Sequence, residues 1–152
     1  MSTWTTQTIV DGTPEEVLAV LSDPDCCCRW SPIDFDLEDL DGDRLQTGSL
    51  ARVAGRVAGI SVRFEINVLH ACGRRLALTA RGPMTLEVEY EAYPADGGRA
   101  EVWATVTVNA ARSLSGRLAA KSTEALLRGG ALTLALRRIA AEVERRADGV
   151  PA

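Results

Sequence analysis

The sequence predicts an α+β domain in which an antiparallel sheet packs against one long C-terminal helix. Between about residues 35 and 109 apolar side chains alternate with polar ones, which is the period of strands that bury one face. After residue 113 the apolar residues recur at alternating steps of four and three, the period of an amphipathic helix. The chain has 152 residues and is 46% hydrophobic, which suits one compact domain. We expect this domain over residues 1–147, followed by a short tail at residues 148–152.

The chain begins with a predicted strand and a predicted helix. Residues 4–10 are rich in threonine and β-branched side chains, which is typical of a strand. Residues 13–16, TPEE, form a capping box with proline at the first helical position, so a helix is expected to end near Leu21. An Asp-Pro pair then breaks this helix. A second short helix or turn is expected to lead to Trp30.

Six further strands are predicted downstream. The clearest alternation covers residues 60–68, where five apolar side chains fall on one face and Ser, Arg, Glu and Asn fall on the other. Turn segments rich in glycine, aspartate and proline separate the strands. Consecutive one-sided strands joined by short turns are typical of an antiparallel meander with one apolar face. The six predicted strands are residues 35–40, 50–57, 60–68, 74–80, 84–92 and 99–109.

The C-terminal segment, about residues 113–146, is predicted to form the long helix. Its inward stripe is small or polar in the first half and bulky in the second half. Small residues either bring the helix closer to the sheet or leave an open pocket, and both alternatives stand at this point. The pair Gly129-Gly130 weakens the helix by about 1 kcal/mol per glycine relative to alanine, so a kink or a cavity-lining role is expected there. The stripe comprises Leu118, Ser122, Ala125, Gly129, Leu132, Leu136, Ile139 and Val143.

Composition and charge argue against several kinds of partner. The net charge is −4 and the arginines are scattered, so no nucleic-acid partner is expected. The N-terminal residues resemble no signal peptide, and no apolar run is long enough to cross a bilayer. We therefore expect a cytoplasmic protein with no membrane span, whose four cysteines are free thiols. An exposed sheet edge leaves both a monomer and a homodimer open.

Two motifs connect the chain with a known superfamily. Residues 14–24, PEEVLAVLSDP, followed by RWSP at residues 29–32, resemble the START-like, Bet v 1-like proteins of the SRPBCC superfamily. Within it the chain is similar to the bacterial polyketide cyclase/dehydrase type, over nearly its whole length. The resemblance implies a helix-grip fold: a seven-stranded antiparallel sheet wrapped around the long C-terminal helix, two short helices after the first strand, and an apolar cavity between sheet and helix. The functions of the superfamily range from lipid carriers through aromatase/cyclases to co-chaperones.

Three consecutive cysteines, Cys26, Cys27 and Cys28, fall in the second short helix that the resemblance implies. Adjacent cysteines lack the C-x(2–4)-C spacing of zinc sites, and a disulfide between neighbours is strained, so neither is expected. Cys27 is expected to pack inward while Cys26 and Cys28 are partly exposed thiols. His70 is the only histidine and is expected at a strand end, outside the cavity.

The predicted function is binding of a small hydrophobic or aromatic ligand, lipid or polyketide-like, inside the cavity. No catalytic residue, metal or cofactor is assigned, because the sequence has no phosphate-binding loop, nucleophile elbow or paired inward carboxylates. One alternative is a polyketide aromatase/cyclase, in which the resemblance implies that Tyr90 and a nearby Arg or Ser polarise carbonyls. Another is a protein-binding module similar to co-chaperones. The residues expected to line the cavity and bind the ligand are Trp30, Phe35, Phe64, Met84, Leu86, Tyr90, Ser122, Ala125, Leu126 and Gly129.

Overall fold

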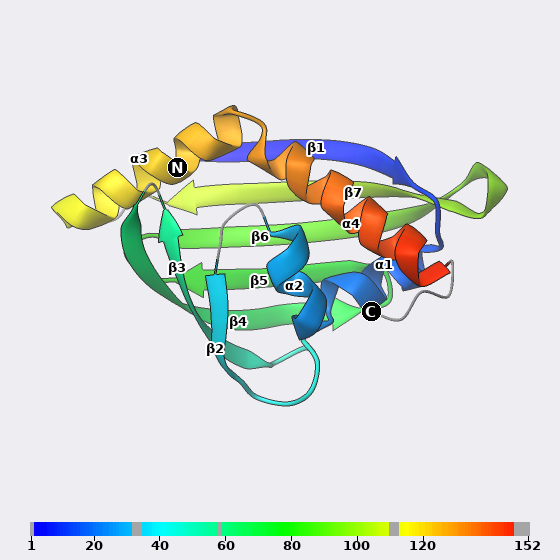
Figure 1. Ribbon diagram of the computed structural model, residues 1–152, viewed down its shortest axis with the longest axis horizontal. Helices are drawn as coiled ribbons and strands as arrows, with labels where there is room; N and C mark the ends of the chain where they lie inside the picture. Colours follow the sequence, from blue (N-terminus) through cyan, green and yellow to red (C-terminus); the bar gives the residue numbers. More distant parts are fainter. Residues whose placement is uncertain (1, 32–34, 58, 110–112, 148–152) are drawn as a thin grey trace.

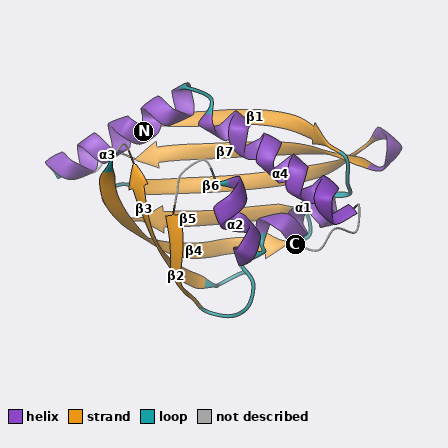
Figure 2. Ribbon diagram, viewed as in Figure 1, coloured by secondary structure: helices purple, strands orange, loops and turns teal. Residues whose placement is uncertain are grey.

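The computed structural model describes residues 2–31, 35–57, 59–109 and 113–147 (Figure 1). A seven-stranded antiparallel sheet has the strand order β1-β7-β6-β5-β4-β3-β2, and the α-helices lie on one side of it (Figure 2). The predicted α+β helix-grip architecture is therefore confirmed. The elements are β1 (Ser2–Val10), α1 (Pro14–Leu21), α2 (Pro24–Trp30), β2 (Phe35–Leu40), β3 (Leu50–Val57), β4 (Ile60–Cys72), β5 (Arg75–Arg81), β6 (Thr85–Ala95), β7 (Arg99–Asn109), α3 (Leu114–Arg128) and α4 (Ala131–Ala147), with a 3-10 turn at Asp96–Gly98.

The sheet follows the alternation read from the sequence. In β7 the residues Ala100, Val102, Ala104, Val106 and Val108 are all buried, while the residues between them are at least partly exposed. The register shifts once between β2 and β3 and once between β4 and β5, and such bulges bend strands and increase their twist. Strand β2 consequently runs steeply across the direction of β5 to β7, so the sheet curls around its inner face (Figure 1).

The first helix begins at the predicted capping box. The Thr13 Oγ1 accepts a hydrogen bond from the Glu16 backbone N–H at 3.2 Å, and Pro14 occupies the first helical position. These contacts satisfy a backbone donor that has no partner within the helix. The helix ends at Leu21, as expected, and α2 follows after two residues.

The C-terminal segment consists of two helices rather than one. Helix α3 ends at Arg128, and α4 begins at Ala131. Between them Gly130 adopts φ +98°, a conformation that side-chain-bearing residues rarely adopt. The Gly129 and Gly130 N–H groups close the last turn by donating to the carbonyls of Ala125 and Leu127 at 2.9 and 3.2 Å. The glycine pair therefore produces the break that its low helix propensity suggested.

Because the chain changes direction at this break, the predicted stripe faces inward in α4 but not in α3. In α4 Leu132, Leu136, Ile139 and Val143 are at most 5% exposed. In α3 the prediction was wrong, because Leu118 is 51% exposed and Ala125 and Gly129 are exposed as well. Helix α3 instead buries Ala119, Ala120 and Thr123. A helical phase carried backwards from α4 cannot continue through a turn with positive φ.

This break gives a first prediction. Gly130→Ala is expected to lower the free energy of unfolding by about 1 kcal/mol or more, because alanine is strained at φ +98°. Gly129→Ala is the matched control, since Gly129 has φ −79° and an added Cβ would approach the Ala125 carbonyl oxygen to 3.3 Å. We expect the control to change stability by roughly 0.5 kcal/mol at most. Urea unfolding measures both variants, and an equal loss in the two would contradict this account of the break.

Candidate ligand-binding cavity

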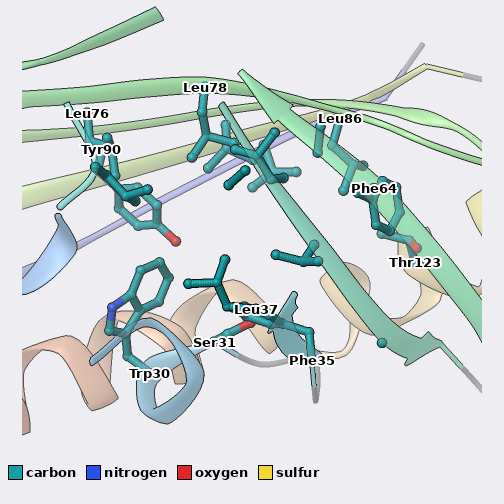
Figure 3. Close-up of a pocket in the computed structure, with 18 of the residues that line it drawn as sticks. Trp30, Ser31, Phe35, Leu37, Phe64, Leu76, Leu78, Leu86, Tyr90 and Thr123 are labelled. Carbon is teal, nitrogen blue, oxygen red and sulfur yellow. The ribbon is translucent and has the colours of Figure 1, made fainter. Parts of the chain in front are cut away.

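A cavity of about 220 Å³ lies between the curled sheet and the helices (Figure 3). Its walls come from the inner faces of β2 to β7, and the helical side is formed by residues of α2, α3 and α4. Most lining side chains are aliphatic or aromatic. The helices thus leave space open against the sheet, but the small residues Ser122, Ala125 and Gly129 do not line it, so neither alternative that their size suggested applies to them.

Cross-strand pairs build the two main walls. Between β5 and β6 every second pair faces the cavity, and between β3 and β4 the same holds, because side chains in a strand alternate between the two faces. The six pairs are Leu76 with Tyr90, Leu78 with Val88, Ala80 with Leu86, Ala51 with Ile66, Val53 with Phe64 and Gly55 with Val62.

The polar side chains of the lining are few. The Trp30 ring meets the Tyr90 ring edge to face, with centroids 5.6 Å apart and an interplanar angle of 77°. In Figure 3 the Tyr90 hydroxyl points into the cavity. The Thr123 hydroxyl donates to the Ala119 carbonyl at 2.9 Å, and Ser31 lies near the Trp30 end. Among the described lining residues there is no Asp, Glu, Lys, Arg or His.

Trp30 has one further feature. Its Nε1 is buried without a hydrogen-bond partner in the described part of the chain, a state that costs about 1–3 kcal/mol for a buried donor. The T-shaped contact with Tyr90 offsets part of this cost, since such aromatic pairs contribute about 0.5–1.5 kcal/mol beyond area burial. Trp30 therefore holds its position through ring packing.

The cavity brings together half of the residues predicted to line it. Trp30, Phe35, Phe64, Leu86 and Tyr90 are all lining residues.

The other five predicted residues lie elsewhere. Met84 is buried in the core, with its sulfur 3.7 Å from the Thr123 Oγ1, and is not a lining residue. Ser122, Ala125, Leu126 and Gly129 lie on or just after α3, away from the cavity lining, and the last three are exposed.

Helix α3 contributes Thr123 and Leu127 to the lining, which the sequence pattern did not predict. These two residues share a helical face with Ala119 and Ala120, at spacings of three and four. This second stripe was present in the sequence, but the predicted stripe was extended backwards in phase from the bulky apolar residues of α4 and therefore passed it over.

A buried carboxylate ties α2 to α4 beside the cavity. Glu142 is 4% exposed and pairs with Arg29 at 3.2 Å and with Arg145 at 3.1 Å. A buried charge requires such partners, because desolvation without them is costly. The pair with Arg29 fixes the helix that carries Trp30.

Cys26 lies in the same contact, which corrects the expectation for this one cysteine. Its side chain is fully buried, with Sγ 3.2 Å from the Arg29 Nη2, 3.3 Å from the Arg146 Nη2 and 4.0 Å from the Glu142 Oε2. The expectation that Cys26 is a partly exposed thiol is therefore wrong, because its face of the short helix packs on α4. The side chains of the other two cysteines lie outside the described residues.

Asp23 completes the connection by pairing with Arg146. Burial alone would raise the pKa of the Asp23 carboxyl, but the hydrogen bond from the Asp25 N–H and the charge of Arg146 outweigh it and lower this pKa below its ordinary value of 3.8. A carboxyl with a lowered pKa in the folded state stabilises the fold above its unfolded pKa. The contribution is lost as the pH falls through the folded pKa.

This pair gives the second prediction. Asp23→Asn is expected to lower the free energy of unfolding by about 1 kcal/mol at pH 7. The asparagine side-chain oxygen can still accept the hydrogen bond from the Asp25 N–H, but the ion pair with Arg146 is lost. The difference from the parent should shrink as the pH falls below 3.8. Urea unfolding between pH 7 and pH 3 measures it, with Asp36→Asn at an exposed position as the control. A difference that stays constant with pH would contradict the role of the charge.

His70 and the acidic side chains of β6 lie away from the cavity lining. The His70 Nε2 is 3.4 Å from the Cys72 Sγ, and neither residue lines the cavity. Glu89 and Glu91 pair with Arg75 on the outer face of the sheet. In the described part of the chain no group of three or more His, Cys, Asp and Glu side chains could hold a metal ion.

Comparisons with known proteins agree with this architecture. The model of the family described as polyketide cyclase/dehydrase and lipid transport matches residues 1–144. No curated protein matches the sequence. No helix in the described ranges is long and apolar enough to cross a membrane.

Several solved structures have the same fold. The Zhui aromatase/cyclase of a Streptomyces species has a TM-score of 0.69 at 19% identity, with 96% of this chain and 95% of that chain covered. A START superfamily protein of Mycobacterium smegmatis has a TM-score of 0.68 at 15% identity, covering 94% and 97%. A protein of Thermus thermophilus has a TM-score of 0.70 at 16% identity, covering 95% and 99%. At these identities the likeness establishes the fold alone.

Proposed function

Because the chain belongs to the polyketide cyclase/dehydrase and lipid transport family, we propose that it binds a small hydrophobic ligand in the cavity between the sheet and the helices. The observation that carries this proposal is the cavity itself, about 220 Å³ in volume and walled by six cross-strand pairs that are apolar except for the Tyr90 hydroxyl. Apolar surface leaves water favourably, so a cavity of this kind favours apolar occupants over polar ones.

The lining chemistry supports binding over catalysis. General acid–base or nucleophilic catalysis needs a titratable or nucleophilic group beside the reacting atoms. The described lining offers the hydroxyls of Ser31, Tyr90 and Thr123, and the Thr123 hydroxyl already donates to a backbone carbonyl. The described lining residues include no Asp, Glu, Lys or His that could act as a base.

A polyketide aromatase/cyclase is the second candidate. The inward Tyr90 hydroxyl favours it, since a phenol can donate a hydrogen bond to a ligand carbonyl (Figure 3). One of the structures with the same fold is an aromatase/cyclase. Product analysis after incubation with a poly-β-keto thioester would separate the candidates, because a cyclase changes the ring products relative to incubation without protein and a binder yields no new ring.

The binding proposal is tested with an environment-sensitive neutral dye. Titration with N-phenyl-1-naphthylamine should give a saturable rise in fluorescence that fits one site per chain. Native mass spectrometry of the freshly purified protein provides an independent readout, in which a co-purified compound appears as added mass that organic extraction removes. Absence of both saturable uptake and added mass would contradict the proposal and favour a protein-binding module.

A further inference from the structure

We infer that the ligand of this cavity is uncharged, an inference that rests on the proposed binding function. One residue in four of the chain is charged, at 25%, yet the described lining residues include none of them. The polar side-chain atoms of the lining belong to Trp30, Ser31, Tyr90 and Thr123, which carry no charge at neutral pH. A charged ligand group would thus meet no counterion among these residues.

The strands of the wall direct their charges outward. Arg52 lies between the lining residues Ala51 and Val53, and its side chain is 68% exposed. Arg63 is flanked by lining residues in the same way, and its side chain is 81% exposed. Because side chains alternate between the two faces of a strand, these guanidinium groups lie on the face opposite the cavity.

Two described cations beside the helical wall already have partners: Arg29 and Arg138, whose Nη1 donates to the Ser31 carbonyl at 2.9 Å. Arg29 precedes Trp30 in α2, but its guanidinium binds the buried Glu142 at 3.2 Å and the Cys26 sulfur at 3.2 Å. Turning it toward a ligand would leave Glu142 with one guanidinium partner fewer in a site that is 4% exposed. Arg29 is therefore a structural cation of the α2–α4 contact.

These placements define a chemical class. An ionised carboxylate, sulfonate or phosphate would lose its hydration without gaining a counterion, which opposes the gain from its apolar part. Carboxylic acids would have to enter in the protonated form. The volume of about 220 Å³ is below the range of roughly 300–1,000 Å³ that is common for drug-sized ligands. The expected ligand is therefore a compact neutral molecule such as an arene, alcohol, ketone or ester. Ionised fatty acids and phospholipids fall outside this class.

Two dyes with one skeleton test the inference. N-phenyl-1-naphthylamine is neutral, and 1-anilinonaphthalene-8-sulfonate adds one sulfonate to the same rings. We expect that displacing the neutral dye takes at least about a 100-fold higher concentration of the sulfonate than of a neutral, non-fluorescent analogue of the dye. Displacement by the sulfonate at a comparable concentration would overturn the inference while leaving the binding function intact. Failure of the neutral dye itself to bind would overturn both.

A pair of variants in α3 adds a positive test. Leu127 lines the cavity and its neighbour Leu126 is 40% exposed outside it, so Leu127→Lys adds a charge inside the cavity and Leu126→Lys adds the same charge outside it. Leu127→Lys should improve displacement by the sulfonate about tenfold or more relative to Leu126→Lys, because only the first supplies a counterion. Equal displacement in two variants that both fold, as judged by circular dichroism, would contradict the inference. The dye pair on the parent protein decides the matter if Leu127→Lys fails to fold.

Discussion

Leu78→Trp is expected to abolish uptake of the neutral dye while the protein stays folded. Leu78 lies in the middle of β5, pairs with Val88 across the wall and projects into the cavity (Figure 3). The larger indole would occupy space that is open in the parent protein. Overpacking of a dense core costs about 1–3 kcal/mol, so a filled cavity should cost less, about 1 kcal/mol or below. Fluorescence titration and thermal unfolding measure the two quantities.

Leu69→Trp provides the matched control for this variant. Leu69 is 54% exposed on β4 and does not line the cavity, so the same substitution there should leave dye uptake unchanged. Normal uptake by Leu78→Trp would place the dye elsewhere on the protein. A strongly lowered melting temperature would show that the cavity cannot accept the added volume.

Gly82→Ala is expected to cause the largest loss of stability, about 3 kcal/mol. A Cβ at Gly82 would lie 2.4 Å from the Arg63 carbonyl oxygen and 2.7 Å from the Phe64 Cδ1, closer than side-chain atoms normally approach. The backbone of β4 would have to move, and Phe64 lines the cavity, so dye affinity should fall as well. Urea unfolding measures the loss, with Gly129→Ala as a substitution of the same kind where the nearest atom is 3.3 Å away. Parent-like stability would show that this part of β4 yields at low cost.

The sheet and the first helix could be predicted from the sequence because their patterns are local. The alternation over residues 60–68 lies within β4, and the capping box of Thr13 and Glu16 is formed by residues three positions apart. The same alternation explains why Phe64, Leu86 and Tyr90 lie on the cavity lining, since successive side chains of a strand alternate between its two faces, while their role in binding a ligand stays a prediction.

The helical side of the cavity depended on contacts that no local pattern contains. The positive φ of Gly130 changes the direction of the chain. Helix α3 therefore presents Thr123 and Leu127 to the cavity, rather than the residues that are in phase with the inward stripe of α4. Cys26 is buried because Glu142, 116 positions away, shares its contact with Arg29. The strands, their inner faces and the family could thus be read from local patterns of residues. Which helical residues complete the cavity depended on packing between distant elements, because this packing, rather than periodicity, orients a helix.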